Sequence, residues 1–248
     1  MSIDIGNAIQ KGLEKGFQRD SVILMGIFFA VSVISQVMGD TLMKNLSESG
    51  TFGSQAQPFS QITMEQLVPL AVNLPTGVAA VGGILTGLLS LTVTVGAVRM
   101  FLNEDVKLET SHFTDNILWV LANIVAGGLL FSLALTAGFI AFIIPGIFLF
   151  ASLFFWSFYV IDKDMNFFEA MKTAWNDTKG NRLRALGLLL IVFIGNAVFA
   201  IVIGGTTSFI GTMAGGIAFG SVLGLLPSAI AVVFTWAIFT EGYKQLSE

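Results

Sequence analysis

Few side chains in this sequence could act on a substrate. His112 is the only histidine, and it lies between Glu109 and Asp115 in an E-x-x-H-x-x-D pattern that could place three groups on one helix face. One imidazole and two carboxylates could hold a divalent ion, but no second histidine exists to complete a typical zinc site. The sequence also has no cysteine, no G-x-S-x-G elbow and no P-loop. We therefore predict no metal, no cofactor and no catalytic residue, and expect that the protein is not an enzyme.

Composition indicates where such a chain must lie. Of its 248 residues, 54% are apolar and only 11% are charged, whereas a soluble domain is about one-quarter charged. The mean hydropathy is +0.83, and these few charges could not cover a globule of 26.5 kDa. The sequence predicts an integral membrane protein, and its net charge of −4 argues against nucleic acid as a partner.

Six apolar stretches are long enough to be membrane helices, which need about 20 apolar residues to cross a bilayer core of about 30 Å. The expected spans are residues 21–38, 77–101, 117–139, 142–161, 185–204 and 217–239. Gly138, Pro145 and Gly146 are expected to form the hairpin turn between the third and fourth spans. The predicted fold class is all-α: a six-helix transmembrane domain over residues 21–239, with amphipathic interfacial helices.

Basic residues are divided unequally between the two sides of this topology. Alternate segments hold all of the 12 Lys and Arg residues except Lys44. Lys and Arg are enriched in cytoplasmic segments, so we expect both termini in the cytoplasm and a multi-pass protein of the cell membrane.

The two ends of the chain are predicted to differ. In residues 1–20, Ile5, Ile9, Leu13 and Phe17 recur every four residues and form one apolar stripe of a cytoplasmic amphipathic helix. This helix would lie on the membrane surface or dock a partner. Residues 240–248 are expected to be a cytoplasmic tail.

The connection after the fourth span is predicted to be an interfacial elbow. Asn166 and Glu169 are spaced as an N-cap pair, and Gly180 is a suitable stop. Aromatic side chains would lie at head-group depth and lysines toward anionic lipid. The elbow residues are Phe167, Phe168, Lys172, Trp175 and Lys179.

On the outer side, two short signals stand in the longest connection. Thr63 and Gln66 are spaced as a capping box for a helix over 64–74. Asn45, followed by Leu46 and Ser47, begins a glycosylation sequon.

Polar groups inside the predicted spans are few. No ionisable residue lies at depth, which argues against transport driven by a buried carboxylate. Asn123 and Asn196 are the candidate intramembrane polar contacts. They could form interhelical hydrogen bonds, or they could line a small polar pocket between the third and fifth helices.

Glycine is unusually frequent, with 27 residues. Glycines four residues apart allow two helix backbones to approach closely in lipid. The predicted packing glycines are Gly83, Gly87, Gly216, Gly220 and Gly224. Their partner would be another helix of the same chain or a second subunit of a homo-oligomer.

Three motifs together carry a resemblance. They are GFIAFIIPGIF at 138–148, YVIDKD at 159–164, and FEAMK at 168–172 followed by Trp175 and KGN at 179–181. They resemble a superfamily of uncharacterised six-helix prokaryotic membrane proteins that includes the membrane domain of some glycerophosphoryl diester phosphodiesterases. The resemblance covers about residues 138–195 and implies a six-helix fold. It does not imply phosphodiesterase activity, because no catalytic domain is expected here, and the glycine-rich, mildly acidic composition is similar to archaeal members.

Two functional hypotheses follow. The first is a non-enzymatic scaffold or accessory subunit that organises membrane lipids or a partner membrane protein. The alternative is a small-molecule or lipid transporter, a permease without a buried carboxylate coupling site, whose cavity would lie near Asn123 and Asn196. A dry, glycine-packed bundle favours the first hypothesis, and a water-accessible cavity favours the second.

Overall fold

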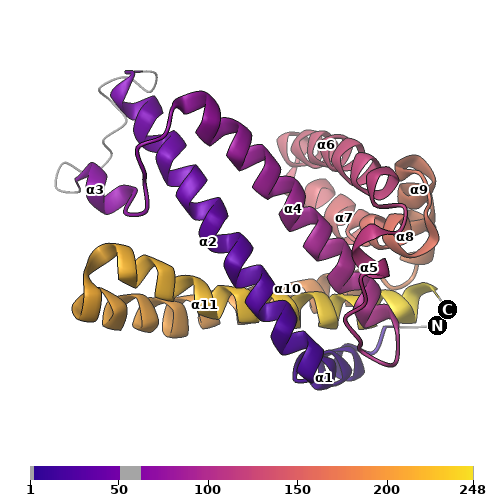
Figure 1. Cartoon of the computed structure of the whole chain (residues 1–248). Helices are drawn as coiled ribbons and strands as arrows, with labels where there is room; N and C mark the ends of the chain where they lie inside the picture. Colours follow the sequence, from indigo (N-terminus) through magenta and orange to yellow (C-terminus); the bar gives the residue numbers. More distant parts are fainter. Residues whose placement is uncertain (1–2, 51–62, 248) are drawn as a thin grey trace. The chain divides into compact units, whose positions relative to one another are not determined.

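Helices are the regular elements of the part of the chain that the structure describes. The structure is a computed structural model, and it describes residues 3–50 and 63–247 (Figure 1). No strand occurs in these two ranges, so the predicted all-α class is confirmed there. The chain divides into two units. The first comprises Met1–Leu24, Thr92–Asn196 and Val232–Glu248, and the second comprises Met25–Leu91 and Ala197–Ala231.

Within residues 3–50 and 63–247, five helical stretches are long and apolar enough, by length and composition, to cross a membrane. They are Arg19–Glu48, Thr76–Leu102, Ile117–Ile140, Ile143–Lys163 and Arg182–Ser247. The first four correspond to the first four predicted spans. The last stretch, of 66 residues, contains the predicted fifth and sixth spans.

In the second unit, parts of α2 (Arg19–Glu48) and α4 (Thr76–Leu102) pack against each other. A Cβ atom placed on Gly82 of α4 would lie 2.6 Å from the sulfur of Met38, so this glycine makes room for the α2 side chain. One turn away, the Ser35 hydroxyl donates to Thr86 Oγ1 at 3.4 Å. Helix α2 continues to Glu48, well past residue 38, where the first span was predicted to end.

Helix α3 (Met64–Leu67) begins with the predicted capping box. Thr63 N donates to Gln66 Oε1 at 2.9 Å, and Gln66 N donates to Thr63 Oγ1 at 3.4 Å. The helix is much shorter than predicted because Val68 precedes Pro69, whose ring disfavours the helical conformation of the residue before it. Val68 accordingly has φ −130° and ψ 61°.

The segment after α3 is held by side chains near the end of α2. Leu70 N donates to Asp40 at 3.0 Å, Val72 N donates to Thr41 at 3.0 Å, and Asn45 Nδ2 donates to Leu74 O at 2.9 Å. Nδ2 is the atom to which a glycan would be attached. In this structure the asparagine of the predicted sequon is therefore engaged in a hydrogen bond within the chain.

The final helical stretch reverses direction once. It consists of α10 (Arg182–Phe199), the π-helical turn η1 (Ala200–Gly204) and α11 (Gly205–Ser247). Inside α11, Gly215 has φ −145° and Gly216 has φ 84° and ψ 178°, neither of which is helical. A positive φ suits glycine because it has no Cβ atom. The chain turns back at this pair, as the golden hairpin of Figure 1 shows.

Glycines line the contact between the two arms of this α11 hairpin, which lies in the second unit. A Cβ atom on Gly211 would lie 2.8 Å from the Cα atom of Gly220, and one on Gly220 would lie 2.6 Å from Ser208 O. A Cβ atom on Gly224 would overlap the Ser208 hydroxyl. Gly220 and Gly224 therefore pack within the chain.

Three of the predicted packing glycines have other positions. Gly216 is the turn residue, so it is not part of the packed face. A Cβ atom on Gly83 or Gly87 would meet nothing within 4 Å in the described structure, so no helix packs closely on them there.

In the first unit, α6 (Ile117–Ala141) and α7 (Ile143–Leu153) form a tight hairpin. The turn is Phe142 alone, with φ −166° and ψ 153°, and Pro145 lies inside the first turn of α7, where its missing N–H is harmless. Gly138 and Gly146 are not turn residues as predicted. They let the two helices approach, because a Cβ atom on Gly138 would lie 3.2 Å from the Cα atom of Gly146.

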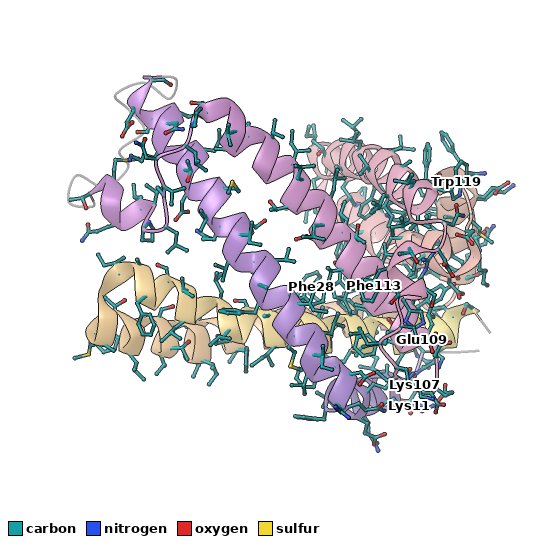
Figure 2. All side chains as sticks on the ribbon, in the orientation of Figure 1. Lys11, Phe28, Lys107, Glu109, Phe113 and Trp119 are labelled. Atoms are coloured by element: carbon teal, nitrogen blue, oxygen red, sulfur yellow. The ribbon has the colours of Figure 1, made fainter. Side chains whose placement is uncertain are left out.

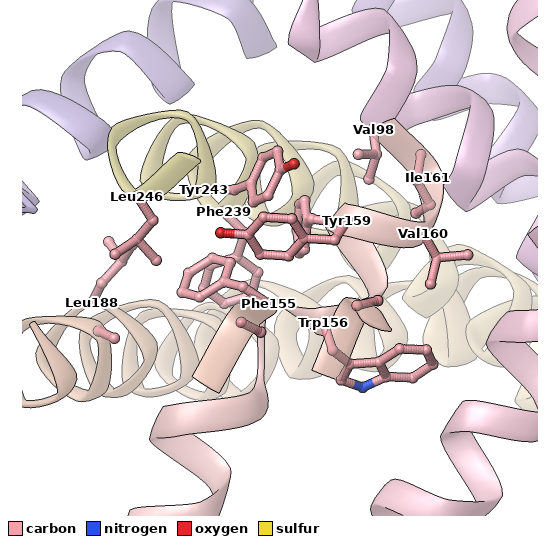
Figure 3. Close-up of a cluster of buried hydrophobic side chains, with 14 of the residues drawn as sticks. Val98, Phe155, Trp156, Tyr159, Val160, Ile161, Leu188, Phe239, Tyr243 and Leu246 are labelled. Atoms are coloured by element: carbon pink, nitrogen blue, oxygen red, sulfur yellow. The ribbon is translucent and has the colours of Figure 1, made fainter. Parts of the chain in front are cut away.

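The core of the first unit is aromatic (Figure 3). It joins α8 (Trp156–Lys163) to α10 and to the end of α11; Phe155, Tyr159 and Tyr243 are fully buried. Residues 240–247 do not form a tail as predicted, because α11 remains helical to Ser247 and its last turns fill this core.

Gly220→Leu is expected to destabilise the monomer, because the new side chain would collide with the backbone at Ser208. Such overpacking costs about 1–3 kcal/mol or more. Gly87→Leu is the matched control, since its Cβ position is open. Thermal unfolding in mild detergent, combined with light scattering, measures both. A Gly220→Leu protein that melts like the control would contradict the observed hairpin.

Candidate functional site

Helix α1 (Ile5–Gly16) brings the first charged group of the site into place. Its buried face consists of small residues: a Cβ atom on Gly12 would lie 2.6 Å from the Cα atom of Ile238, and one on Gly16 would overlap the ring of Phe234. The predicted apolar stripe contributes in part: Ile5 and Ile9 pack against the core, whereas Leu13 is 40% exposed and Phe17 is 75% exposed. Helix α1 docks on α11 closely through Gly12 and Gly16, which the predicted stripe did not include.

This docking buries an ion pair between Lys15 and Glu241. The ammonium nitrogen lies 2.7 Å from a carboxylate oxygen of Glu241, and the two side chains are only 8% and 4% exposed. Lys15 also donates to Phe101 O at 2.7 Å and to Asn103 O at 3.1 Å. Burial lowers the pKa of Lys15, and the carboxylate of Glu241 opposes this shift.

The two carbonyls that Lys15 binds lie at the end of α4. The last carbonyls of a helix have no partner within it, and the helix dipole favours a cation there. A second cation extends the network, since Lys244 lies 3.6 Å from Glu241 and 2.5 Å from Glu104. The bond from Lys244 lowers the pKa of Glu104. The network thus joins α1, α4 and α11. Figure 2 shows Lys11, Lys107 and Glu109 around the same end of the first unit.

Arg99, one turn earlier on α4, binds three backbone carbonyls of two further segments, α8 and the short helix α5 (Ser111–Thr114) with its C-cap. It donates to Ile161 O of α8 at 3.4 Å, to His112 O at 3.2 Å and to Asp115 O at 2.7 Å. His112 belongs to α5, and Asp115 is its C-cap. The guanidinium group also lies 3.8 Å from the Asp164 carboxylate.

A hollow of about 300 Å³ lies beside Arg99. It is lined by Arg99, Leu102, Asn103, Ser111, His112, Asp115, Ile161, Asp162 and Asp164. Several of its polar groups have partners within the chain: Asp164 accepts from Asn116 at 3.1 Å, and Nε2 of His112 lies 3.3 Å from the amide of Asn103. Among the residues that the structure describes, no group of three His, Cys, Asp or Glu side chains is placed to hold a metal ion.

Two buried tyrosines form bonds that the sequence analysis missed. Tyr159 donates to Asp177 at 2.6 Å, and Tyr243 donates to Asp162 at 2.7 Å. Their rings meet edge to face with centroids 4.9 Å apart, as Figure 3 shows. They are the only two tyrosines of the chain, which is the one signal that could have singled them out.

Asn123 and Asn196 have separate partners. Asn123 accepts from Phe167 N at 3.0 Å, so this α6 side chain caps the start of α9 (Phe167–Asp177). Asn196 donates to Thr235 of α11 at 2.8 Å. Each amide thus bonds a different element. These contacts do not bring the two amides together around the single pocket that was predicted.

The predicted elbow, α9, packs more deeply than expected. Its N-cap is as predicted, with Glu169 N donating to Asn166 at 3.0 Å. Phe167 packs against the core, whereas the ring of Phe168 faces outward and is 66% exposed. Trp175 stacks with the Arg182 guanidinium, 4.4 Å from its ring centroid. Lys172 and Lys179 are exposed.

A second polar hollow, of about 360 Å³, lies within the second unit. It is lined by Ser32, Ser35, Gln36, Gly39, Ser90 and Leu225. These residues come from α2, α4 and the second arm of the α11 hairpin, and none of them carries a charge. The sequence analysis did not predict this hollow, although Ser32, Ser35 and Gly39 lie at helical spacing on one face of α2.

Lys15→Met is expected to lower the free energy of unfolding by about 3 kcal/mol, because Glu241 would stay buried without its nearest cation. Combining Lys15→Met with Glu241→Leu should recover most of this loss. Lys107→Met is the control: its pair with Asp105 joins side chains that are 67% and 83% exposed, and such pairs contribute about 0–1 kcal/mol. Denaturant unfolding in detergent measures all four proteins, and equal losses for Lys15→Met and Lys107→Met would contradict the pair's role.

Comparison with known proteins places this arrangement in one family. No curated protein and no solved structure matches the chain. One family model matches residues 3–246, nearly the whole chain, and its description is "Domain of unknown function (DUF7847)". The match covers both units, with the ion pair in the first and the uncharged polar hollow in the second. The chain belongs to the DUF7847 family.

Proposed function

We propose that this protein is a non-enzymatic, multi-pass protein of the cell membrane, a scaffold or accessory subunit that organises lipids or a partner membrane protein. One observation supports this proposal above the others. The charged side chains of the first unit bind backbone carbonyls and one another: Lys15 joins α1 to α4 and α11, and Arg99 joins α4 to α5 and α8. These groups hold helices together, as the structural core of a scaffold requires.

The outer faces of the helices suit a protein that meets lipids or another apolar surface. On α6, Leu129 and Leu133 are 66% and 69% exposed, and on α10 Ile194 is 61% exposed. Apolar side chains of this size are costly to expose to water. A bilayer, or a partner within it, would cover them.

Six spans with both termini in the cytoplasm form the topological part of the proposal. The reversal at Gly215 and Gly216 supports six, because it divides the 66-residue stretch into two antiparallel arms. The unequal distribution of Lys and Arg supports the orientation.

A lipid or small-molecule permease is the second candidate function. The uncharged polar hollow of the second unit supports it, because a hollow with a few polar groups among apolar helices can bind a ligand. This hollow, and not the surroundings of Asn123 and Asn196, would be its binding site.

The topology can be tested with single cysteines, because the chain has none of its own. Asn73→Cys and Lys179→Cys both replace exposed residues. An impermeant thiol reagent added to intact cells is expected to label the first and not the second. Lysed cells should label both, which controls for reactivity. The reverse pattern in intact cells would overturn the orientation.

The scaffold role can be tested with photo-crosslinking residues at Leu129 and Leu133. After purification in mild detergent, these positions are expected to carry one discrete membrane protein or an enriched lipid class. Val120 on the same helix is fully buried, so the same residue there should crosslink only within the chain. Recovery of bulk lipids in membrane proportions, with no protein, would contradict the scaffold proposal.

A further inference from the structure

The hollow of the second unit contains hydroxyl groups that have no partner in the described structure. Serines in helices usually donate to the carbonyl four residues earlier, as Ser132 and Ser221 do here. The side-chain hydroxyls of Ser32 and Ser90 make no such bond, and no other hydrogen bond with the residues that the structure describes. Both hydroxyls are therefore available to a ligand in a space of about 360 Å³.

The remaining polar groups of the hollow set the charge of that ligand. Gln36 donates to Asp40 at 2.7 Å, which leaves the amide oxygen of Gln36 as an acceptor. Asp40 also accepts from Leu70 N, so both of its carboxylate oxygens are engaged. Because no Lys or Arg lines the hollow, a phosphate or carboxylate would find no counter-ion there. The donors and acceptors suit an uncharged, hydroxyl-bearing group.

Exposed apolar side chains on the helices that line the hollow indicate what else the ligand carries. Ile34 of α2, Leu89 of α4 and Leu226 of α11 are 45%, 44% and 39% exposed. A ligand with a polar head and an acyl chain could place its head among the hydroxyls and its chain along the apolar outer faces of these helices.

We propose that this hollow binds the uncharged, hydroxyl-bearing head of a glycerol lipid such as diacylglycerol. Its ester oxygens would accept from Ser32 and Ser90, and its single hydroxyl would donate to the amide oxygen of Gln36. The inference rests on the proposed membrane role and deepens it by naming the lipid class. Free glycerol offers the same hydroxyl chemistry without the acyl chains.

The test is direct binding to the purified full-length chain, followed by native mass spectrometry. An amine-oxide detergent is required, because a maltoside head is itself a polyol and would compete. Dioleoylglycerol is expected to bind one per chain. Ser32→Ala combined with Ser90→Ala should weaken it about tenfold, since both hydrogen bonds are lost. Ser90→Leu, which fills the hollow, should abolish binding.

Ser132→Ala and Ser132→Leu are the matched controls, because Ser132 is exposed on α6 and already donates to Gly128 O. Both should bind dioleoylglycerol like the unmodified chain. The alanine variants remove no packing volume, so their melting temperatures should stay unchanged and show that binding, not folding, is measured.

Two further ligands, free glycerol and phosphatidic acid, test whether the acyl chains and the uncharged head are both required. Free glycerol that binds as tightly as dioleoylglycerol would overturn the lipid assignment, and phosphatidic acid that binds as tightly would overturn the uncharged head. Equal binding of dioleoylglycerol by the unmodified chain and the double alanine variant would overturn the site itself. None of these results depends on a partner protein, so failure here is distinguishable from failure of the scaffold proposal.

Discussion

The buried contact between Lys15 and Glu241 is the constraint on which the first unit depends. An ion removed from water is costly unless its partner and hydrogen bonds are in place, so the pair requires α1 and α11 to meet in one register. The same ammonium group binds the last carbonyls of α4, which fixes where that helix ends. Arg99 then positions α5 and α8 from the neighbouring turn. A wrong approach of α1 would leave the Lys15 ammonium and two carbonyls without these partners, and Glu241 without its nearest cation.

Close backbone approach is the second theme, and it recurs in both units. Gly12 in the first unit and Gly220 in the second unit each face a neighbouring backbone at a distance that a Cβ atom would not allow, and Gly138 in the first unit's hairpin faces one at a distance that leaves a Cβ atom little room. Packing of this kind does not rely on the exclusion of water, which is weak between helices in lipid. These contacts account for a few of the 27 glycines.

How far the sequence predicts this molecule depends on whether a feature is local. Apolar length predicts the helical stretches, and cap spacing predicts the starts of α3 and α9, because both signals lie within a few residues. Which face of α1 is buried depends on Glu241 and Phe234, more than two hundred residues away, and the apolar periodicity within α1 does not by itself identify that face. The burial of Tyr243 also depends on residues distant in the sequence, and it places a segment that was predicted to be a tail in the core. The hollow near Ser32 and Ser90 was missed because its lining comes from three helices. A search for Ala8, Gly12 and Gly16 at four-residue spacing would have found the docking face.

The contact of α1 with α11 also dictates an order of assembly. Asp4 N donates to Gln245, so the first turn of the protein bonds to nearly the last. During synthesis, α1 leaves the ribosome long before its partner exists. Its small-residue face and Lys15 must therefore wait, solvated or at the lipid surface, until translation reaches Glu241.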